Sequence, residues 1–155
     1  MYSKILVPLD GSSYSERALE HASELVRGTG AEIILLEAVQ DSLAAVPEAR
    51  YRAPVSQVYG SAIRGRKYLD GVARRIRHDG ERVRYDVLEG DPKDTILSYA
   101  QRENVDMIVM CTHGHAGFTR RILGCLAEKL VFMSRCPIML VKGGVPTSQV
   151  VAKAA

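Results

Sequence analysis

The sequence lacks the features of membrane proteins and of small disulfide-rich proteins. Its longest apolar runs are far shorter than the ~20 residues of a membrane-spanning helix. The apolar run at residues 5–9 stops at Asp10-Gly11, which is typical of a strand rather than a signal peptide. The chain has three cysteines, an odd number without metal-ligand spacing, which argues against a disulfide framework and a zinc site. We expect a soluble cytoplasmic protein.

Familiar catalytic patterns, internal repeats and low-complexity segments are also missing. We find no Ser-His-Asp set, no paired carboxylates and no lysine-bearing phosphate loop. The pair His113 and His115 lacks a nearby third metal ligand and does not match the histidine pair of nucleotidyl transferases. The 155 residues, 46% hydrophobic and 25% charged, fit one globular domain. We expect that domain at residues 1–142, followed by a C-terminal tail at 143–155.

The net charge of +3 is unevenly distributed along the chain. Residues 50–84 contain ten Lys and Arg against three Asp and Glu, a local charge of +7. The remaining residues contain 11 basic and 15 acidic side chains, a local charge of −4. The basic segment is either a solvated helix face or a surface for an anionic partner.

Apolar runs and helical patterns alternate from one end of the chain to the other. The strands are expected at residues 4–9, 32–39, 82–88, 105–110 and 138–141. The third alternates in polarity, as an edge strand does. Helices are expected from Ser13, where Ser13 to Glu16 forms a capping box, over about 57–78, from Asp91-Pro92, and over about 125–134.

This alternation predicts an α/β fold with an open five-stranded parallel sheet, order 3-2-1-4-5, and helices on both faces. The strand order reverses between the first and fourth strands, and ligands bind outside the carboxyl ends of strands at such a point. The loops at residues 8–11 and 110–124 should therefore face each other across a crevice.

The second of these loops has the composition of an anion site. Its glycines allow backbone N–H groups to approach a phosphate, and a helix begins at its end. Arg120 and Arg121 add positive charge. These features favour the phosphates of a nucleotide, and the alternative is a long surface loop with turn glycines.

Asp10 lies at the end of the first strand, on the other side of the expected crevice. Its carboxylate can accept hydrogen bonds from ribose hydroxyls or an adenine amino group, although Asp before Gly is also a common turn residue. Backbone groups near Ala38 and Val39, at the end of the second strand, could line the base pocket.

These segments together resemble a single-domain universal stress protein over residues 1–142. The matching pieces are KILVPLDGS, ILLEAV, EGDP, DMIVM, THGHAGFTRRILG and AEKLVFMSRCPIMLVK. The resemblance implies an adenine nucleotide alpha hydrolase-like fold, a homodimer and, in one branch of the family, bound ATP. That branch carries glycine, two residues, glycine, nine residues, glycine, and then serine or threonine.

On this chain the second and third glycines of the pattern are Gly114 and Gly124. Cys111 stands at the first glycine position, and Cys125 at the hydroxyl position. Because a thiol is a weaker hydrogen-bond donor than a hydroxyl, we expect weaker binding of the terminal phosphate. A thiol at a helix N-terminus also suggests a redox response, with Cys111 on the same rim, or simply a tolerated small residue.

The resemblance implies that Asp10 and Ala38 hold the adenosine, and that Met110, Gly114, Gly124, Cys125 and Leu126 surround the ribose and phosphates. Mg²⁺ could accompany the ATP, and no protein ligands to a metal are predicted. The full set of predicted nucleotide contacts is Pro8, Leu9, Asp10, Ala38, Val39, Met110, Cys111, His113, Gly114, Gly117, Arg120, Gly124, Cys125, Leu126 and Ala127.

The expected function is an ATP-binding, dimeric regulatory module of the stress response. No general base is apparent beside the expected phosphates, so an enzyme is not expected. The alternatives are a slow ATP hydrolase and a nucleotide-free interaction protein that uses residues 50–84. The strand at residues 138–141 is apolar and at a sheet edge, so it should pair with a second copy unless the tail covers it.

Overall fold

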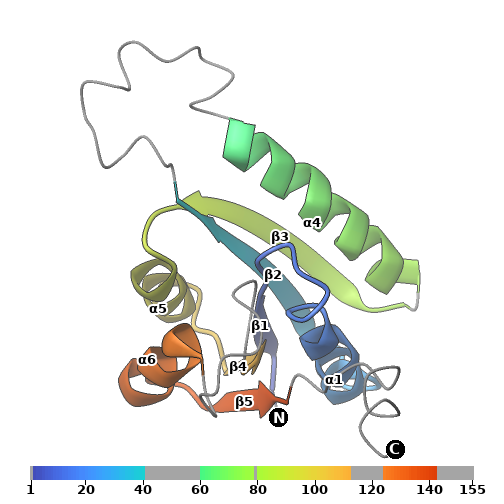
Figure 1. Cartoon of the computed structure of the whole chain (residues 1–155). Coiled ribbons are helices and arrows are strands. Elements are labelled where there is room, and N and C mark those ends of the chain that lie inside the picture. The colour runs from blue at the N-terminus through green and yellow to red at the C-terminus, as the bar shows by residue number, and fades with distance from the viewer. Residues whose placement is uncertain (1, 41–59, 79, 113–123, 143–155) are drawn as a thin grey trace, which may run out of the picture.

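The chain forms one parallel sheet with helices on both faces (Figure 1). A computed structural model describes residues 2–40, 60–78, 80–112 and 124–142. Within them the strand order is β3-β2-β1-β4-β5, which confirms the predicted topology. The strands are β1 (Lys4–Pro8), β2 (Glu32–Val39), β3 (Arg82–Glu89), β4 (Met107–Cys111) and β5 (Ile138–Val141).

The helices divide into two layers. One face of the sheet packs against α1 (Arg17–Val26) and α4 (Gly60–His78), and the other against α5 (Pro92–Arg102) and α6 (Cys125–Met133). The predicted start of α4, at about residue 57, lies outside the described residues. The predicted tail, 143–155, lies outside them as well.

The central strands are buried on both faces. Ile33 and Leu35 of β2 pack with the α1 and α4 layer, whereas Ile34 and Leu36 pack with the α5 and α6 layer. All four are completely inaccessible to solvent. Burial on both faces explains why β2 is apolar almost throughout instead of alternating.

The edge strand β3 is polar on one face. Val83 packs under α4, while Arg84 points to the opposite face and donates hydrogen bonds to Glu32 at 3.1 Å and Glu103 at 2.8 Å. Arg84 also donates to the hydroxyl of Tyr99 at 2.8 Å, and that hydroxyl donates to Asp86. Burial and the hydrogen bond to Asp86 raise the pKa of Tyr99. This network pairs the Arg84 and Asp86 side chains of β3 with residues of β2 and α5.

The capping box predicted at Ser13 is wrong, because α1 begins at Arg17. The serine that stabilises the preceding turn is Ser12, whose hydroxyl accepts a hydrogen bond from the Ser15 N–H at 3.2 Å. Glu16 instead accepts a hydrogen bond from Tyr68 at 3.0 Å and forms an ion pair with Arg75. Its carboxylate therefore contacts α4 and does not cap α1.

The predicted start of α5 is confirmed. The Asp91 carboxylate accepts hydrogen bonds from the backbone N–H groups of Lys93 and Asp94, at 3.0 and 3.2 Å, and Pro92 occupies the first turn. The preceding Gly90 has a φ of +147°, and its N–H donates to the Val39 carbonyl at 3.0 Å. The turn therefore links the end of β2 to α5.

We expect Gly90→Ala to lower the free energy of unfolding by about 1–3 kcal/mol, because this backbone conformation is unfavourable for any residue with a β-carbon. The new β-carbon would also lie 2.7 Å from Oγ1 of Thr95. Urea denaturation measures the change. Gly71→Ala is the matched control, since among the described residues no atom other than those of its chain neighbours and its own helix backbone lies within 4 Å of its β-carbon position in α4. It should stabilise by roughly 0.5–1 kcal/mol, and equal effects of both variants would contradict the prediction.

Candidate functional site

The carboxyl ends of the central strands meet at one edge of the sheet. In the parallel pairing of β1 and β2, Pro8 lies opposite Leu36. The N–H of Leu9 donates to the Leu36 carbonyl at 2.8 Å, which continues this pairing by one residue. Pro8 and Leu9 are both buried, and they bring the chain to Asp10 at the surface.

A pocket of about 580 Å³ opens at this edge, between the end of β2 and α4. Three of the predicted contacts, Asp10, Ala38 and Val39, lie together in its lining. The remaining lining residues were not predicted from the sequence, and they are Gly11, Glu37, Gln40, Ser61, Arg64, Gly65 and Tyr68. Their one sequence signal is that Ser61, Arg64, Gly65 and Tyr68 recur at helical spacing.

Asp10 is held in a tight, hydrogen-bonded turn. Its Oδ1 accepts hydrogen bonds from the N–H of Ser12 at 3.0 Å and from the Ser12 hydroxyl at 2.6 Å. Gly11 has a φ of +80°, which suits glycine. Because Ser12 and Ser15 are buried beneath the turn, the exposed Asp10 carboxylate has a defined orientation at the pocket.

The pocket contains charges of both signs. Burial and the nearby Asp10 carboxylate raise the pKa of Glu37. Arg64 contributes an exposed guanidinium, and Tyr68 forms part of the wall while its hydroxyl donates to Glu16. Burial, followed by the charge of Glu16, raises the pKa of Tyr68, which keeps its hydroxyl neutral.

The start of α6 is attached to the end of β4. Gly124 is the N-cap residue of α6, and its N–H donates to the Thr112 carbonyl at 2.8 Å. Cys125 is exposed in the first turn, whereas Leu126 is half-buried and Ala127 is buried against the α5 side. The helix N-terminus thus lies at the same edge of the sheet as Asp10.

The loop expected to contact phosphates lies outside the described residues. His113, Gly114, Gly117 and Arg120 belong to it, so their predicted roles stay predictions. The prediction that this loop faces Asp10 across a crevice stays a prediction for the same reason.

The side chains of Met110 and Cys111 belong to the hydrophobic core. Met110 packs on the α5 and α6 side, and Cys111 packs on the α1 side with its Sγ 3.9 Å from the Ser15 carbonyl oxygen. Cys111 therefore does not share an exposed rim with Cys125, contrary to one sequence-based expectation. Burial raises the pKa of the Cys111 thiol, which opposes the thiolate form. The side chains of these two residues therefore pack in the core, and their predicted ligand contacts stay predictions.

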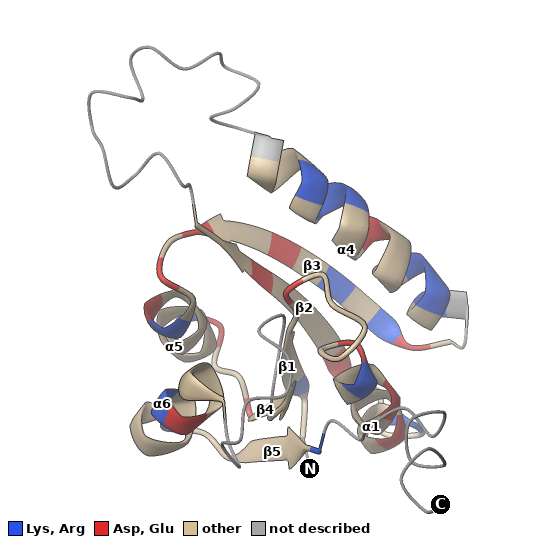
Figure 2. Cartoon of the chain, in the orientation of Figure 1, with Lys and Arg blue, Asp and Glu red and all other residues tan. Residues whose placement is uncertain are grey.

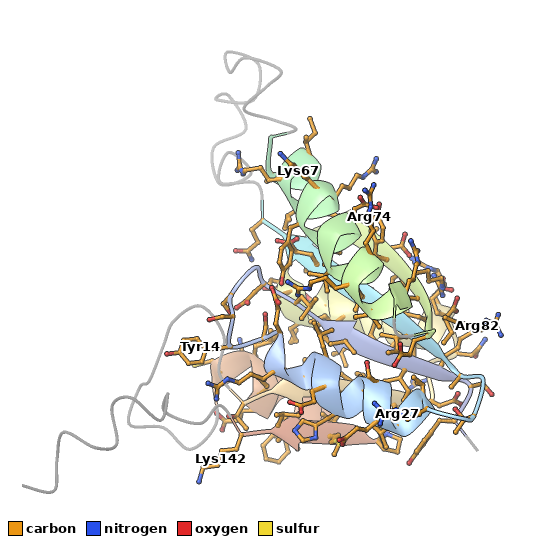
Figure 3. All side chains as sticks on the ribbon, turned by 90° about the vertical axis from the view of Figure 1, so that its right-hand side faces the viewer. Tyr14, Arg27, Lys67, Arg74, Arg82 and Lys142 are labelled. Carbon is orange, nitrogen blue, oxygen red and sulfur yellow. The ribbon has the colours of Figure 1, made fainter. Side chains whose placement is uncertain are left out.

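The basic segment is partly neutralised within the fold. Figure 2 shows several basic residues along α4. Arg74 of α4 pairs with Asp70 at 2.8 Å, and Arg75 pairs with Glu16. Lys67 and Arg74 project away from α4 (Figure 3), and Arg66 and Lys67 are exposed. The basic segment therefore stays either a solvated helix face or a surface for an anionic partner.

Two other hollows occur on the described surface. One lies between α5 and the segment joining α6 to β5, and the other between α1 and α4. Neither includes a predicted contact residue. Among residues 2–40, 60–78, 80–112 and 124–142, no helix has the length and apolar character of a membrane span, and no three His, Cys, Asp or Glu side chains are grouped to hold a metal.

Sequence comparison identifies the family. A model of the universal stress protein family matches residues 1–142. The universal stress protein MJ0531 of Methanocaldococcus jannaschii is 30% identical over 143 residues, which cover 92% of this chain and 83% of that protein. The solved structure of MJ0577, from the same organism, has a TM-score of 0.83 at 26% identity and covers 94% of this chain and 99% of its own.

Two further solved structures of this fold contain nucleotides. A universal stress protein in complex with cAMP has a TM-score of 0.66 at 20% identity, covering 92% of this chain and 98% of its own. A family member from Arabidopsis thaliana with AMP bound has a TM-score of 0.64 at 23% identity, covering 96% and 99%. At these identities the likeness establishes the fold.

We expect the thiols to react at different rates in the folded protein. Cys125 is exposed and should react fast with a disulfide reagent, whereas the buried Cys111 should react only after unfolding. Stopped-flow labelling with peptide mapping measures both rates. Cys125→Ser should remove the fast phase, and Cys136→Ser, which removes a half-buried thiol, should retain it. Labelling of folded Cys111 as fast as Cys125 would contradict this assignment.

Proposed function

Because the chain belongs to the universal stress protein family, we propose that it binds an adenine nucleotide, ATP, at the carboxyl edge of β1 and β2. The observation that carries this proposal is the convergence of Asp10, Ala38 and Val39 in one pocket. Asp10 comes from the end of β1, and the other two come from the end of β2. Carboxyl ends of parallel strands are where α/β folds bind ligands.

The residues present fit a nucleoside. The pocket volume, about 580 Å³, is within the range of roughly 300–1,000 Å³ that small ligands and cofactors occupy. Ala38 and Val39 provide apolar surface and backbone groups for a base. The oriented Asp10 carboxylate can accept hydrogen bonds from ribose hydroxyls or an exocyclic amino group.

The phosphates would be held by the first turn of α6. The positive end of its dipole attracts anions, and Gly124 has no side chain to obstruct them. Gly114, Gly117 and Arg120 would add contacts from the neighbouring loop. The nucleotides named in the two related structures, cAMP and AMP, support the adenine nucleotide class. Binding of ATP, with Mg²⁺ neutralising its phosphates, is our proposal for this chain.

We propose that the protein acts in the cytoplasm as a homodimer joined through β5. This strand is at the sheet edge, and its Met139 is exposed. In the last turn of α6, which precedes β5, Val131, Phe132 and Met133 are also exposed. A second copy would cover both the apolar side chains and the unpaired edge, and ATP would favour one arrangement of the dimer.

Asp10→Asn should weaken ATP binding by about tenfold or more, since hydrogen bonds to a charged group contribute roughly 1.5–3 kcal/mol. The asparagine keeps an oxygen that can accept from Ser12, so the turn should persist. Isothermal titration calorimetry with ATP, ADP, AMP and cAMP measures the affinities. Asp94→Asn, an exposed carboxylate on α5 and on the other face of the sheet, is the control and should bind ATP like the parent. Absence of saturable binding at millimolar nucleotide would refute the proposed function.

Met139→Lys should convert the dimer to a monomer, because it places a desolvated charge in the interface. Sedimentation equilibrium distinguishes the two states. The control is Ile63→Lys, which makes the same kind of change at an exposed position on α4 and should leave the dimer intact. A parent chain that sediments as a 17.0 kDa monomer at every concentration would rule out the dimer.

A further inference from the structure

Glu37 has an unusual position for a carboxylate on a central strand. It belongs to β2, two residues beyond the buried Leu35 on the same face, and it lines the candidate nucleotide pocket. Its Oε2 is inaccessible to solvent and has no hydrogen-bond partner within the part of the chain that the structure describes. A buried carboxylate oxygen without a donor strongly disfavours the ionised form.

Gly65 of α4 makes this burial possible. A β-carbon on Gly65 would lie 2.8 Å from Glu37 Oε2 and 3.1 Å from a methyl carbon of Val87. The glycine therefore allows α4 to pack directly over the Glu37 carboxyl group. Oε2 is enclosed between α4, β2 and β3, and the remainder of the side chain borders the pocket.

The charges that face Glu37 act in opposite directions. From the loop after β1, the negative charge of Asp10 opposes ionisation and, with burial, raises the pKa of Glu37. From α4, the pocket is lined by the cationic Arg64 and by the neutral Tyr68 hydroxyl, which donates to Glu16. From β3, the residue in register with Glu37 is the apolar Val87. The carboxyl group thus has a carboxylate neighbour and no donor on Oε2.

We propose that Glu37 controls the affinity of the pocket for anionic nucleotides through its protonation. With Glu37 neutral, the pocket binds the anionic nucleotide, whereas ionised Glu37 places a second negative charge beside Asp10 in the same pocket. This inference rests on the proposed function, which supplies the nucleotide as the ligand. The physical cause of the protonation is the packing of α4 over β2. Its consequence is that nucleotide affinity falls as Glu37 loses its proton.

Glu37→Gln tests the ligand step, because glutamine has nearly the same shape and cannot ionise. ATP affinity is measured by calorimetry at one pH below and one pH above the titration of Glu37 in the folded protein, and between them we expect the parent to lose roughly tenfold more affinity than the variant. The variant retains His113 and His115, so their titration contributes equally to both proteins. Glu32→Gln, the same change on the same strand at its salt bridge with Arg84, should keep the parent's pH dependence. An identical pH dependence in the parent and Glu37→Gln would overturn the proposal.

A ligand-free measurement separates this proposal from the proposed function. In the unfolded chain Glu37 ionises near its ordinary pKa of about 4.3. The folded state holds the proton to higher pH, so Glu37 stabilises the fold fully below that pKa and loses this contribution as pH rises through the folded pKa. The unfolding temperature of Glu37→Gln relative to the parent should therefore increase with pH.

Carbon-13 NMR of the glutamate carboxyl groups, assigned by Glu37→Gln, gives the titration directly. The titration midpoint of Glu37 could lie above those of the other glutamates while the protein fails to bind ATP. That result would refute the proposed function and the control of nucleotide affinity, but it would leave the raised pKa of Glu37 standing. An ordinary midpoint, even with tight ATP binding, would refute the inference itself.

Discussion

The burial of β1 and β2 on both faces determines where everything else in this protein lies. Ile5, Leu6 and Val7 of β1 are inaccessible to solvent, as are residues 33–36 of β2. Both strands therefore need helices above and below, and only parallel strands with crossover helices provide that cover. Parallel pairing in turn brings the carboxyl ends of both strands to the same edge. Asp10 and Val39 meet there, although 28 residues separate them in sequence.

The two edge strands of the sheet, β3 and β5, differ in the polarity of their side chains. At β3, Arg84 joins Glu32, Asp86 and Glu103 in a charged network around the buried Tyr99. Charged side chains at an edge discourage pairing with another chain. The β5 edge has no such network among the described residues, and its Met139 is exposed beside the apolar end of α6. This asymmetry is the physical reason to expect association through β5 rather than β3.

The pocket combines an oriented carboxylate, a neutral phenol and an enclosed carboxyl group. Asp10 is fixed by Ser12, Tyr68 is neutral, and the Glu37 carboxyl group is enclosed by α4. A preorganised acceptor, an apolar wall and one proton-linked group can select a ligand and respond to conditions. The same close packing at Gly65 means that any shift of α4 would alter the solvation of Glu37. In the proposed binding mode, the affinity for the nucleotide would therefore depend on the position of α4.

Much of the architecture was predictable because it follows from local pattern. The apolar run of β2, the alternation of β3 and the Asp91-Pro92 helix start each reflect constraints that operate within a few residues, so the strand order and the positions of Asp10, Ala38 and Val39 at strand ends could be anticipated. The family resemblance added expected roles for these positions. The capping box predicted at Ser13 does not form: α1 begins at Arg17, and the Glu16 carboxylate contacts Tyr68 and Arg75 of α4 instead.

Only the tertiary structure decided which side chains share the pocket with Asp10. Glu37 looks like one polar residue in an apolar strand, and Gly65 looks like a weak point in a helix. The roles of Glu37 and Gly65 depend on the contact between α4 and β2. The periodicity of the sequence does not predict this contact, because the two segments are far apart in the chain. Cys111 shows the same division. The sequence places it at the start of a glycine-containing loop, while packing against α1 buries its thiol in the core.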